Sequence, residues 1–229
     1  MAANIVGISS MATRQVLAEL GAAYQKKTRQ SVAIESVGGV DAARRIRAGE
    51  KFDIVVLADG AMRQLEADGF VKSGSRAAFA DSAIAVAVKS RAKRPSLTDE
   101  ESLKAAILVA QSICYSTGPS GAHVIRLLEK WGIDRLMSER IVQAPPGIPV
   151  GTLVARGEAE LGFQQLSEFL DVPGIDIVGP LPREIQSLTR FSCGVCMLAS
   201  NEAEARGFIG YLTSSEADAS KRRHGMEPV

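Results

Sequence analysis

Short apolar runs, many of them β-branched, alternate along this chain with longer segments that have the apolar spacing of amphipathic helices. The expected strands are residues 4–8, 31–37, 54–58, 83–88, 112–115, 160–164, 175–178 and 191–198. The expected helices are residues 13–27, 41–48, 61–68, 103–110, 122–131, 150–156, 166–170, 202–212 and 215–224. Because strands that alternate with helices form parallel sheets with helical crossovers, the pattern predicts an α/β protein with mainly parallel sheets and flanking helices.

The order of these elements also predicts two lobes. Strand–helix units stand on both sides of a basic, proline-containing stretch, residues 90–96, which we interpret as a surface link between the lobes. The last strand and the C-terminal helices are expected to return to the first lobe. Lobe 1 therefore comprises residues 1–86 and 190–229, and lobe 2 comprises residues 87–189.

Charge and composition exclude several classes of partner. The 27 basic and 26 acidic side chains are mixed along the chain, and aromatic residues make up only 5%. A nucleic-acid partner is not expected, because it would require a basic stripe or stacking aromatic side chains. No apolar run is long enough to span a membrane, and the N-terminus has no basic segment followed by an apolar one. As written, the sequence predicts a cytoplasmic protein, or a periplasmic one if a signal peptide was trimmed.

Two of the three cysteines, Cys193 and Cys196, have the spacing of a redox or metal motif. They lie within an apolar strand pattern, whereas a thioredoxin-type motif opens a helix and a zinc site needs a second ligand pair. We therefore expect both to be buried and reduced, with Cys193 and Val195 on one face of the strand and Cys196 on the other. No metal and no cofactor is expected.

Three segments of small polar residues follow expected strands and precede expected helices: residues 9–13, 38–41 and 116–121. Ligands of parallel α/β proteins bind at the carboxyl ends of strands, so we expect the three segments to converge on one interlobe cleft. Unobstructed backbone amides at a helix N-terminus, together with serine and threonine hydroxyls, can hold an anion without a dedicated cation. Each segment alone fits an ordinary helix cap better than a binding site, but three of them in matching positions favour the binding site.

The chain resembles the molybdate-binding-protein branch of the periplasmic binding proteins over nearly its whole length. The stretches that carry this resemblance are GISSMAT (7–13), FDIVVLAD (52–59), ARGEAELGF (155–163), YLTSSEA (211–217) and HGMEP (224–228). The resemblance implies the two-lobed type II periplasmic-binding-protein fold with an interlobe cleft. It also implies a solute-binding protein for a small anion, either an oxyanion or a carboxylate, that works with an ABC permease.

The resemblance implies where the ligand is held. Candidate ligand-binding residues from these segments and from the resemblance are Ser9, Ser10, Thr13, Gly38, Gly39, Val40, Ser120, Pro149, Val150, Gln164 and Arg190. Two departures separate the chain from molybdate binders. Gly38, Gly39 and Val40 stand where a serine is usual, and Gln164 with Gln165 stands where a tyrosine is usual. Because these glutamines and Arg190 are planar donors, we expect a carboxylate to be preferred over bare molybdate.

Residues 179–186 resemble a divergent subgroup related to aconitate isomerase, which leaves an alternative open. A cytosolic isomerase of an unsaturated di- or tricarboxylate would need cationic clamps and a base that moves an allylic proton. Arg14, Arg126 and Arg190 are candidate clamps, and Asp41 or His123 is a candidate base. Arg14 and Arg126 fit solvated helix faces better than clamps, and His123 fits an exposed residue of a first helical turn better than a base. A third alternative is a ligand-sensing domain.

Overall fold

The structure of the protein, a computed structural model, describes residues 5–145 and 147–229. The chain forms two compact units: unit 1 is Met1–Ser82 with Arg190–Val229, and unit 2 is Ala83–Thr189. Strand β4 (Ala77–Lys89) leaves unit 1 for unit 2, and β9 (Leu188–Val195) returns. The two extended strands therefore make the connections.

The proposed link at residues 90–96 is wrong, because this stretch belongs entirely to unit 2. It follows β4 as a turn in which Arg91 has a left-handed backbone, with φ of 67°. The Asp176 carboxylate fixes this turn by accepting hydrogen bonds from the Ser90 hydroxyl and the Arg91 amide. The basic and proline residues that suggested a link therefore belong to a local surface loop.

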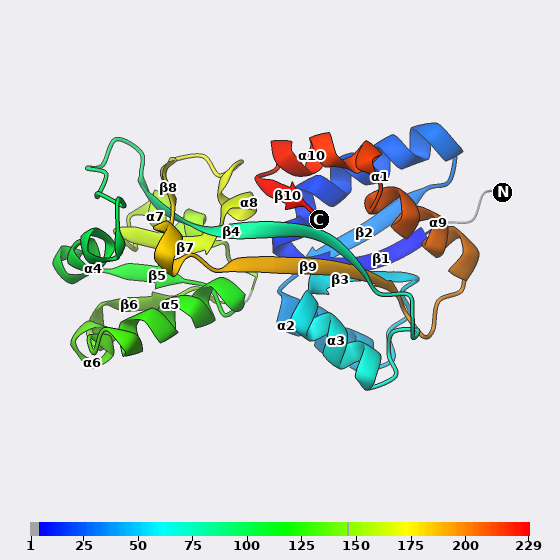
Figure 1. The fold of residues 1–229 in the computed structure, drawn as a ribbon, viewed down its shortest axis with the longest axis horizontal. Coiled ribbons are helices and arrows are strands. Elements are labelled where there is room, and N and C mark those ends of the chain that lie inside the picture. The colour runs from blue at the N-terminus through cyan, green and yellow to red at the C-terminus, as the bar shows by residue number, and fades with distance from the viewer. Residues whose placement is uncertain (1–4, 146) are drawn as a thin grey trace. The chain divides into compact units, whose positions relative to one another are not determined.

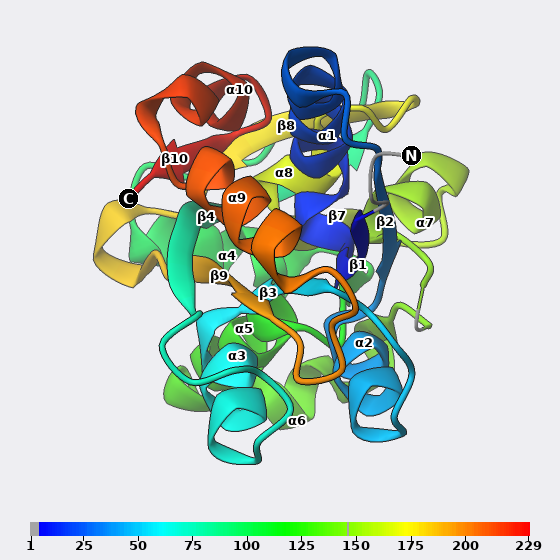
Figure 2. The ribbon, with the colours of Figure 1, turned by 90° about the vertical axis from the view of Figure 1, so that its right-hand side faces the viewer.

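Unit 1 is built on a sheet whose core is parallel. Its strands are β1 (Ile5–Ser10), β2 (Val32–Val37), β3 (Ile54–Ala58), the first part of β4, β9 and β10 (Met226–Pro228). β1 pairs in parallel with β2 and β3, whereas β9 runs antiparallel to β3 and β10 runs antiparallel to β4. Helices α1 (Arg14–Thr28), α9 (Glu202–Leu212) and α10 (Asp218–Arg223) cover one face, and α2 (Gly39–Arg47) and α3 (Asp59–Ala67) cover the other (Figures 1 and 2).

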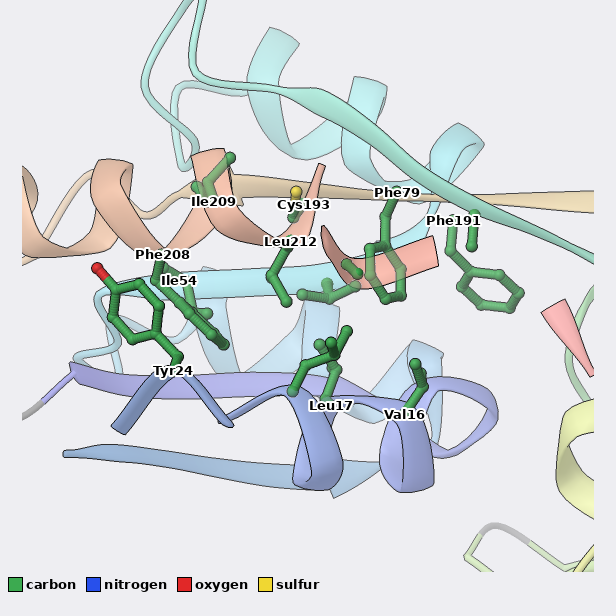
Figure 3. Packing of buried hydrophobic residues seen from close by; sticks show 14 of the residues in the cluster. Val16, Leu17, Tyr24, Ile54, Phe79, Phe191, Cys193, Phe208, Ile209 and Leu212 are labelled. Carbon is green, nitrogen blue, oxygen red and sulfur yellow. The ribbon is translucent and has the colours of Figure 1, made fainter. Parts of the chain in front are cut away.

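The face of this sheet under α1 and α9 carries the larger core of unit 1 (Figure 3). Leu17 of α1 and Leu212 of α9 lie in this cluster together with strand residues such as Ile54. The rings of Tyr24 and Phe208, 5.0 Å apart, join the two helices directly. The helical spacing of the apolar residues thus packs segments that lie far apart in the sequence.

The expected alternation of the cysteine strand is confirmed. Cys193 and Val195 belong to the core under α1, and Cys196 belongs to the core under α2 and α3. Both thiols are free and buried, and burial raises the pKa of each to about 12. Because the thiolate is the reactive form of cysteine, neither side chain is suited to redox chemistry in this environment.

Unit 2 has a second sheet with the same plan. Its strands are the last part of β4, β5 (Ile113–Tyr115), β6 (Ile141–Gln143), β7 (Leu161–Gln165) and β8 (Ile175–Pro180). β5 is parallel to β6 and β7, and β4 is antiparallel to β7 and β8. Its helices are α4 (Glu100–Val109), α5 (Pro119–Lys130), α6 (Asp134–Met137), α7 (Val150–Arg156) and α8 (Leu166–Phe169). α4, α5 and α6 lie on one side of the sheet, and α7 and α8 lie on the other (Figure 1).

Several helices begin two or three residues earlier than expected. α2 begins at Gly39 rather than 41, α3 at Asp59 rather than 61, and α5 at Pro119 rather than 122. Glycine and proline obscure these starts in the sequence, but both are tolerated in a first turn, where the N–H groups lack helical acceptors in any case. The short strands β6 and β10 were not expected, and β4 begins at Ala77 rather than 83. No helix among the described residues is long and apolar enough to cross a membrane.

Candidate functional site

The carboxyl ends of three neighbouring parallel strands, β2, β1 and β3, meet at one edge of the unit 1 sheet. Ser9 of β1 lies opposite Ser36 of β2, and their hydroxyl oxygens are 2.8 Å apart. The Thr13 hydroxyl donates to the Ser10 carbonyl at 3.0 Å. Ser9 and Thr13 are fully buried, so these two predicted site residues support the edge from within. Ser36 was missed, although it is the last polar residue of the second strand and stands two positions before Gly38.

Ser10 is the residue of this segment that is suited to touch a ligand. It precedes the 3-10 helix Met11–Thr13 and is only half-buried. Its Oγ accepts a hydrogen bond from the Ala12 amide at 3.3 Å. A hydroxyl that accepts still has its proton to donate, so Ser10 can donate to an anion at the sheet edge.

The N-terminus of α2 lies at the same edge, directly after β2. Gly38 is the N-cap residue, and no side chain of the described residues caps the helix. The N–H groups of Gly39, Val40 and Asp41 have no acceptor within the helix and carry its partial positive charge. A Cβ on Gly38 would meet no atom of the described residues within 4 Å, and the Val40 side chain is 71% exposed. The predicted segment therefore presents open backbone donors.

Asp59 follows β3 at this edge and was not predicted as a site residue. Its carboxylate accepts hydrogen bonds from Ser192 Oγ at 2.6 Å, Arg63 Nε at 2.7 Å and Arg76 Nη1 at 2.6 Å. Burial raises the pKa of Asp59, but the hydrogen bonds from Ser192 and Arg63 and the charge of Arg76 outweigh it, so the pKa lies below its usual value. The ionised carboxylate is thus committed to neighbouring donors and is a poor candidate for a base.

Unit 2 has a related arrangement where β5 leads into α5. Ser116 Oγ lies 3.4 Å from Ser120 Oγ and accepts a hydrogen bond from the Gly118 amide at 3.3 Å. No side chain of the described residues caps α5. A Cβ on Gly121 would lie 1.7 Å from the Ser116 carbonyl oxygen, so only glycine lets the first turn of α5 pack this closely against β5. The predicted residue Ser120 is buried in this turn.

Three other predicted residues of unit 2 either hydrogen-bond within unit 2 or have no amide proton to donate. The Val150 amide donates to Gln164 Oε1 at 3.0 Å, and Gln164 Nε2 donates to Glu168 at 2.8 Å. Pro149 is the N-cap residue of α7 and has no amide proton to offer. In this conformation, the Val150 amide and both ends of the Gln164 side chain are used within unit 2. The neighbouring Gln165 has one end of its amide bonded to Thr189.

The candidate clamps and bases are mostly held by local partners. Arg190 makes a two-pronged pair with Asp81, with both N–O distances 2.9 Å. Asp41 is ion-paired with Arg44, which lies on the same helix. His123 Nε2 lies 2.7 Å from the Ile185 carbonyl oxygen. The remaining two candidates, Arg14 and Arg126, are exposed on their helices. Convergence of the three small-residue segments on one cleft stays a prediction.

Comparison with known proteins gives one family and several relatives. The model of the family described as "Bacterial extracellular solute-binding protein" matches residues 5–227. An aconitate isomerase of Pseudomonas sp. is 35% identical over 228 residues, which cover 97% of this chain and 87% of that protein. The molybdate-binding protein ModA of Azotobacter vinelandii is 24% identical over 196 residues, which cover 79% of this chain and 73% of that protein.

Among solved structures, the periplasmic molybdate-binding protein of Azotobacter vinelandii matches with a TM-score of 0.81. It is 22% identical in sequence, and the match covers 97% of this chain and 98% of the other. A likeness at this identity is evidence for the fold, and it confirms the predicted α/β class of the type II periplasmic binding proteins.

Proposed function

This chain belongs to the bacterial extracellular solute-binding protein family, and we propose that unit 1 binds a small anion at Ser10 and the N-terminus of α2. One observation carries the proposal: an uncapped helix of nine residues opens onto the empty space beside Gly38, at the strand edge that Ser9, Ser10 and Ser36 line. A helix N-terminus carries about half a positive charge, and its free N–H groups point at an anion.

We infer that the ligand carries a carboxylate. The support is the aconitate isomerase that is 35% identical over 97% of this chain, against 24% for the molybdate-binding relative. Gln164 and Arg190 do not support a carboxylate in this conformation, because Gln164 bonds Val150 and Glu168, and Arg190 bonds Asp81. Backbone amides and the Ser10 hydroxyl accommodate a carboxylate without these two side chains.

Calorimetry and thermal melting test this function with molybdate, tungstate, sulfate, citrate and the two aconitate isomers, since a ligand of the folded state raises the melting temperature. We expect a carboxylate to bind and Ser10→Ala to weaken it about tenfold, the value of a hydrogen bond to a charged group. Ser73→Ala, on the surface of unit 1, is the matched control. The proposal fails if no anion binds, or if Ser10→Ala binds as tightly as Ser73→Ala.

The family also suggests a partner and a location. We propose that the protein acts outside the cytoplasm and delivers its ligand to an ABC permease, as expected of a solute-binding protein. Fractionation of cells that express the full-length gene tests the location. Uptake of labelled ligand by vesicles that contain a candidate permease, with and without this protein, tests the partnership. A protein retained in the cytoplasm would favour the sensing or enzymatic alternatives.

The Pseudomonas relative favours one second function, an isomerase that moves a double bond within an unsaturated carboxylate. The Ile185 carbonyl can only accept, so the His123 proton sits on Nε2 and leaves Nδ1 with a lone pair. His123 Nδ1 would remove a proton from one carbon, and a proton would return to another as the double bond shifts.

Proton NMR of cis- and trans-aconitate in heavy water tests this reaction directly. An isomerase interconverts them with exchange of the allylic hydrogen for deuterium, and His123→Asn should slow this at least about a hundredfold, as for loss of a general base. His224→Asn is the matched control, because the chain has only these two histidines. Binding without interconversion would leave the binding function alone.

A further inference from the structure

The side-chain amide of Gln165, the last residue of β7, forms a hydrogen bond through its nitrogen but, among the described residues, none through its oxygen. Its side-chain Nε2 donates to Thr189 Oγ1 at 2.7 Å. Its Oε1 is buried and has no hydrogen-bond partner among residues 5–145 and 147–229, in a residue that is only 2% exposed. A buried polar atom without a partner costs about 1–3 kcal/mol, and such atoms are rare in native proteins. A carbonyl oxygen in this position calls for a donor that the described residues do not supply.

The register of the unit 2 sheet shows where this oxygen lies. β7 runs parallel to β5 with Phe163 opposite Tyr115, so both strands end at the same edge. Phe163 packs in one cluster with Val124 and Leu127 of α5. Side chains alternate along a strand, so Gln165 projects from the same face as Phe163, the face that α5 covers. Gln165 Oε1 therefore lies at the sheet edge where α5 begins with an uncapped N-terminus.

We propose that the start of α5 is an anion site within unit 2 and that Gln165 Oε1 accepts a hydrogen bond from a hydroxyl group of the ligand bound there, which makes this ligand a hydroxy-carboxylate. This inference rests on the proposed function, anion binding, which it extends to unit 2, and it adds a donor to the chemistry of the ligand. The Ser116 and Ser120 hydroxyls and the amides of the first turn of α5 can donate to the carboxylate part. Gln165 then distinguishes the hydroxylated ligand from its deoxy analogue.

Other donors fit this position less well. An ammonium group would be repelled by the partial positive charge at the start of α5. A protonated carboxyl group is scarce at neutral pH because its ordinary pKa is about 4. Fully ionised molybdate or sulfate has only acceptor oxygens, which would face the lone pairs of Gln165 Oε1. A neutral hydroxyl group is the donor compatible with both the helix and the amide.

Matched ligand pairs test the proposal by calorimetry at about pH 8, where the carboxylates of each pair are ionised. The pairs are citrate with tricarballylate and malate with succinate, which differ by one hydroxyl group. We expect the wild type to bind the hydroxylated member at least about tenfold more tightly, because the deoxy member leaves Gln165 Oε1 unpaired. Aconitate, which has no hydroxyl group, should bind like tricarballylate.

Two substitutions make the test specific. Gln165→Met keeps the length of the side chain but removes the acceptor, so the preference for the hydroxyl group should disappear. Gln111→Met, on the surface of unit 2, is the matched control and should keep it. If Gln165→Met does not fold, Gln165→Glu provides the second measurement. It keeps an acceptor of the same size, so both affinities should fall by charge repulsion while their ratio stays in favour of the hydroxylated member.

The outcomes separate this inference from the function on which it rests. Equal binding of both members of each pair, or a preference that persists in Gln165→Met, would overturn the role of Gln165 and leave anion binding intact. A preference for the deoxy member would mean that the amide is turned, with Thr189 donating to its oxygen and Nε2 facing the ligand. Failure of every anion to bind would refute the proposed function together with this inference.

Discussion

Gly38→Asp should weaken anion binding at unit 1 roughly a hundredfold without destabilising the fold. Gly38 has φ of −56° and ψ of 137°, a conformation open to any residue, and its Cβ would meet no described atom within 4 Å. At the N-cap position, an aspartate accepts hydrogen bonds from the free amides of α2 and stabilises the helix by a few tenths of a kcal/mol relative to glycine. The same carboxylate occupies the donors that the ligand needs.

The loss of affinity can be worked from the charge alone. Two like charges about 5 Å apart repel by about 3 kcal/mol at an effective dielectric constant of about 20, which corresponds to roughly a hundredfold in affinity. Calorimetry measures the binding, and thermal melting without ligand measures the fold. Gly210→Asp, on an exposed position of α9 with no described atom within 4 Å of its Cβ, is the matched control. A folded Gly38→Asp variant that binds within about threefold of the wild type would refute the assignment.

Three further predictions concern the packing and charges that stabilise each unit by itself. Gly121→Ala, whose Cβ would lie 1.7 Å from a backbone oxygen, should lower the free energy of unfolding by at least about 2 kcal/mol in urea titrations, whereas Gly118→Ala should not. Burial lowers the pKa of Lys221 below 10.5, so the wild type gains stability as pH rises toward that value. Lys221→Met should be as stable as the wild type or more stable at neutral pH, and this advantage should shrink at alkaline pH. The hydrogen bond from Arg223 holds the pKa of Glu19 at about 2, so the contribution of the Glu19 carboxylate to stability is complete above pH 4.5 and is lost as pH falls toward 2. Glu19→Gln should lower the free energy of unfolding by about 1 kcal/mol at neutral pH, since the carboxylate is partly exposed, and should make stability depend less on pH in acid.

The sequence predicted those features that depend on local periodicity. The order of strands and helices and the opposite faces of Cys193 and Cys196 follow from spacings of two and of three to four residues. The hydrogen bond from Ser192 to Asp59 could not be predicted, because the two residues lie 133 positions apart in the chain.

Gln164 and Gln165 show that neighbouring residues of one strand can have quite different partners. β7 ends at Gln165 rather than 164, and Gln164 bonds Val150 on one face while Gln165 bonds Thr189 on the other. Composition identifies a pair of side-chain amides at this strand end, but only the register of the strand decides which of the two has an oxygen without a hydrogen-bond partner among the described residues.

Unit 2 is one continuous stretch of chain inserted into unit 1, and this fixes the order in which the two can fold during synthesis. Residues 83–189 contain every strand and helix that closes their own core. Unit 1 must wait, because β3 pairs with β9 and Leu17 packs in one cluster with Phe208, and both partners leave the ribosome after unit 2. Residues 5–82, though made before unit 2, therefore finish folding after it, in contrast to the usual order for multidomain chains. Until residues 190–229 emerge, the β3 edge stays unpaired, and an exposed strand edge is a template for aggregation.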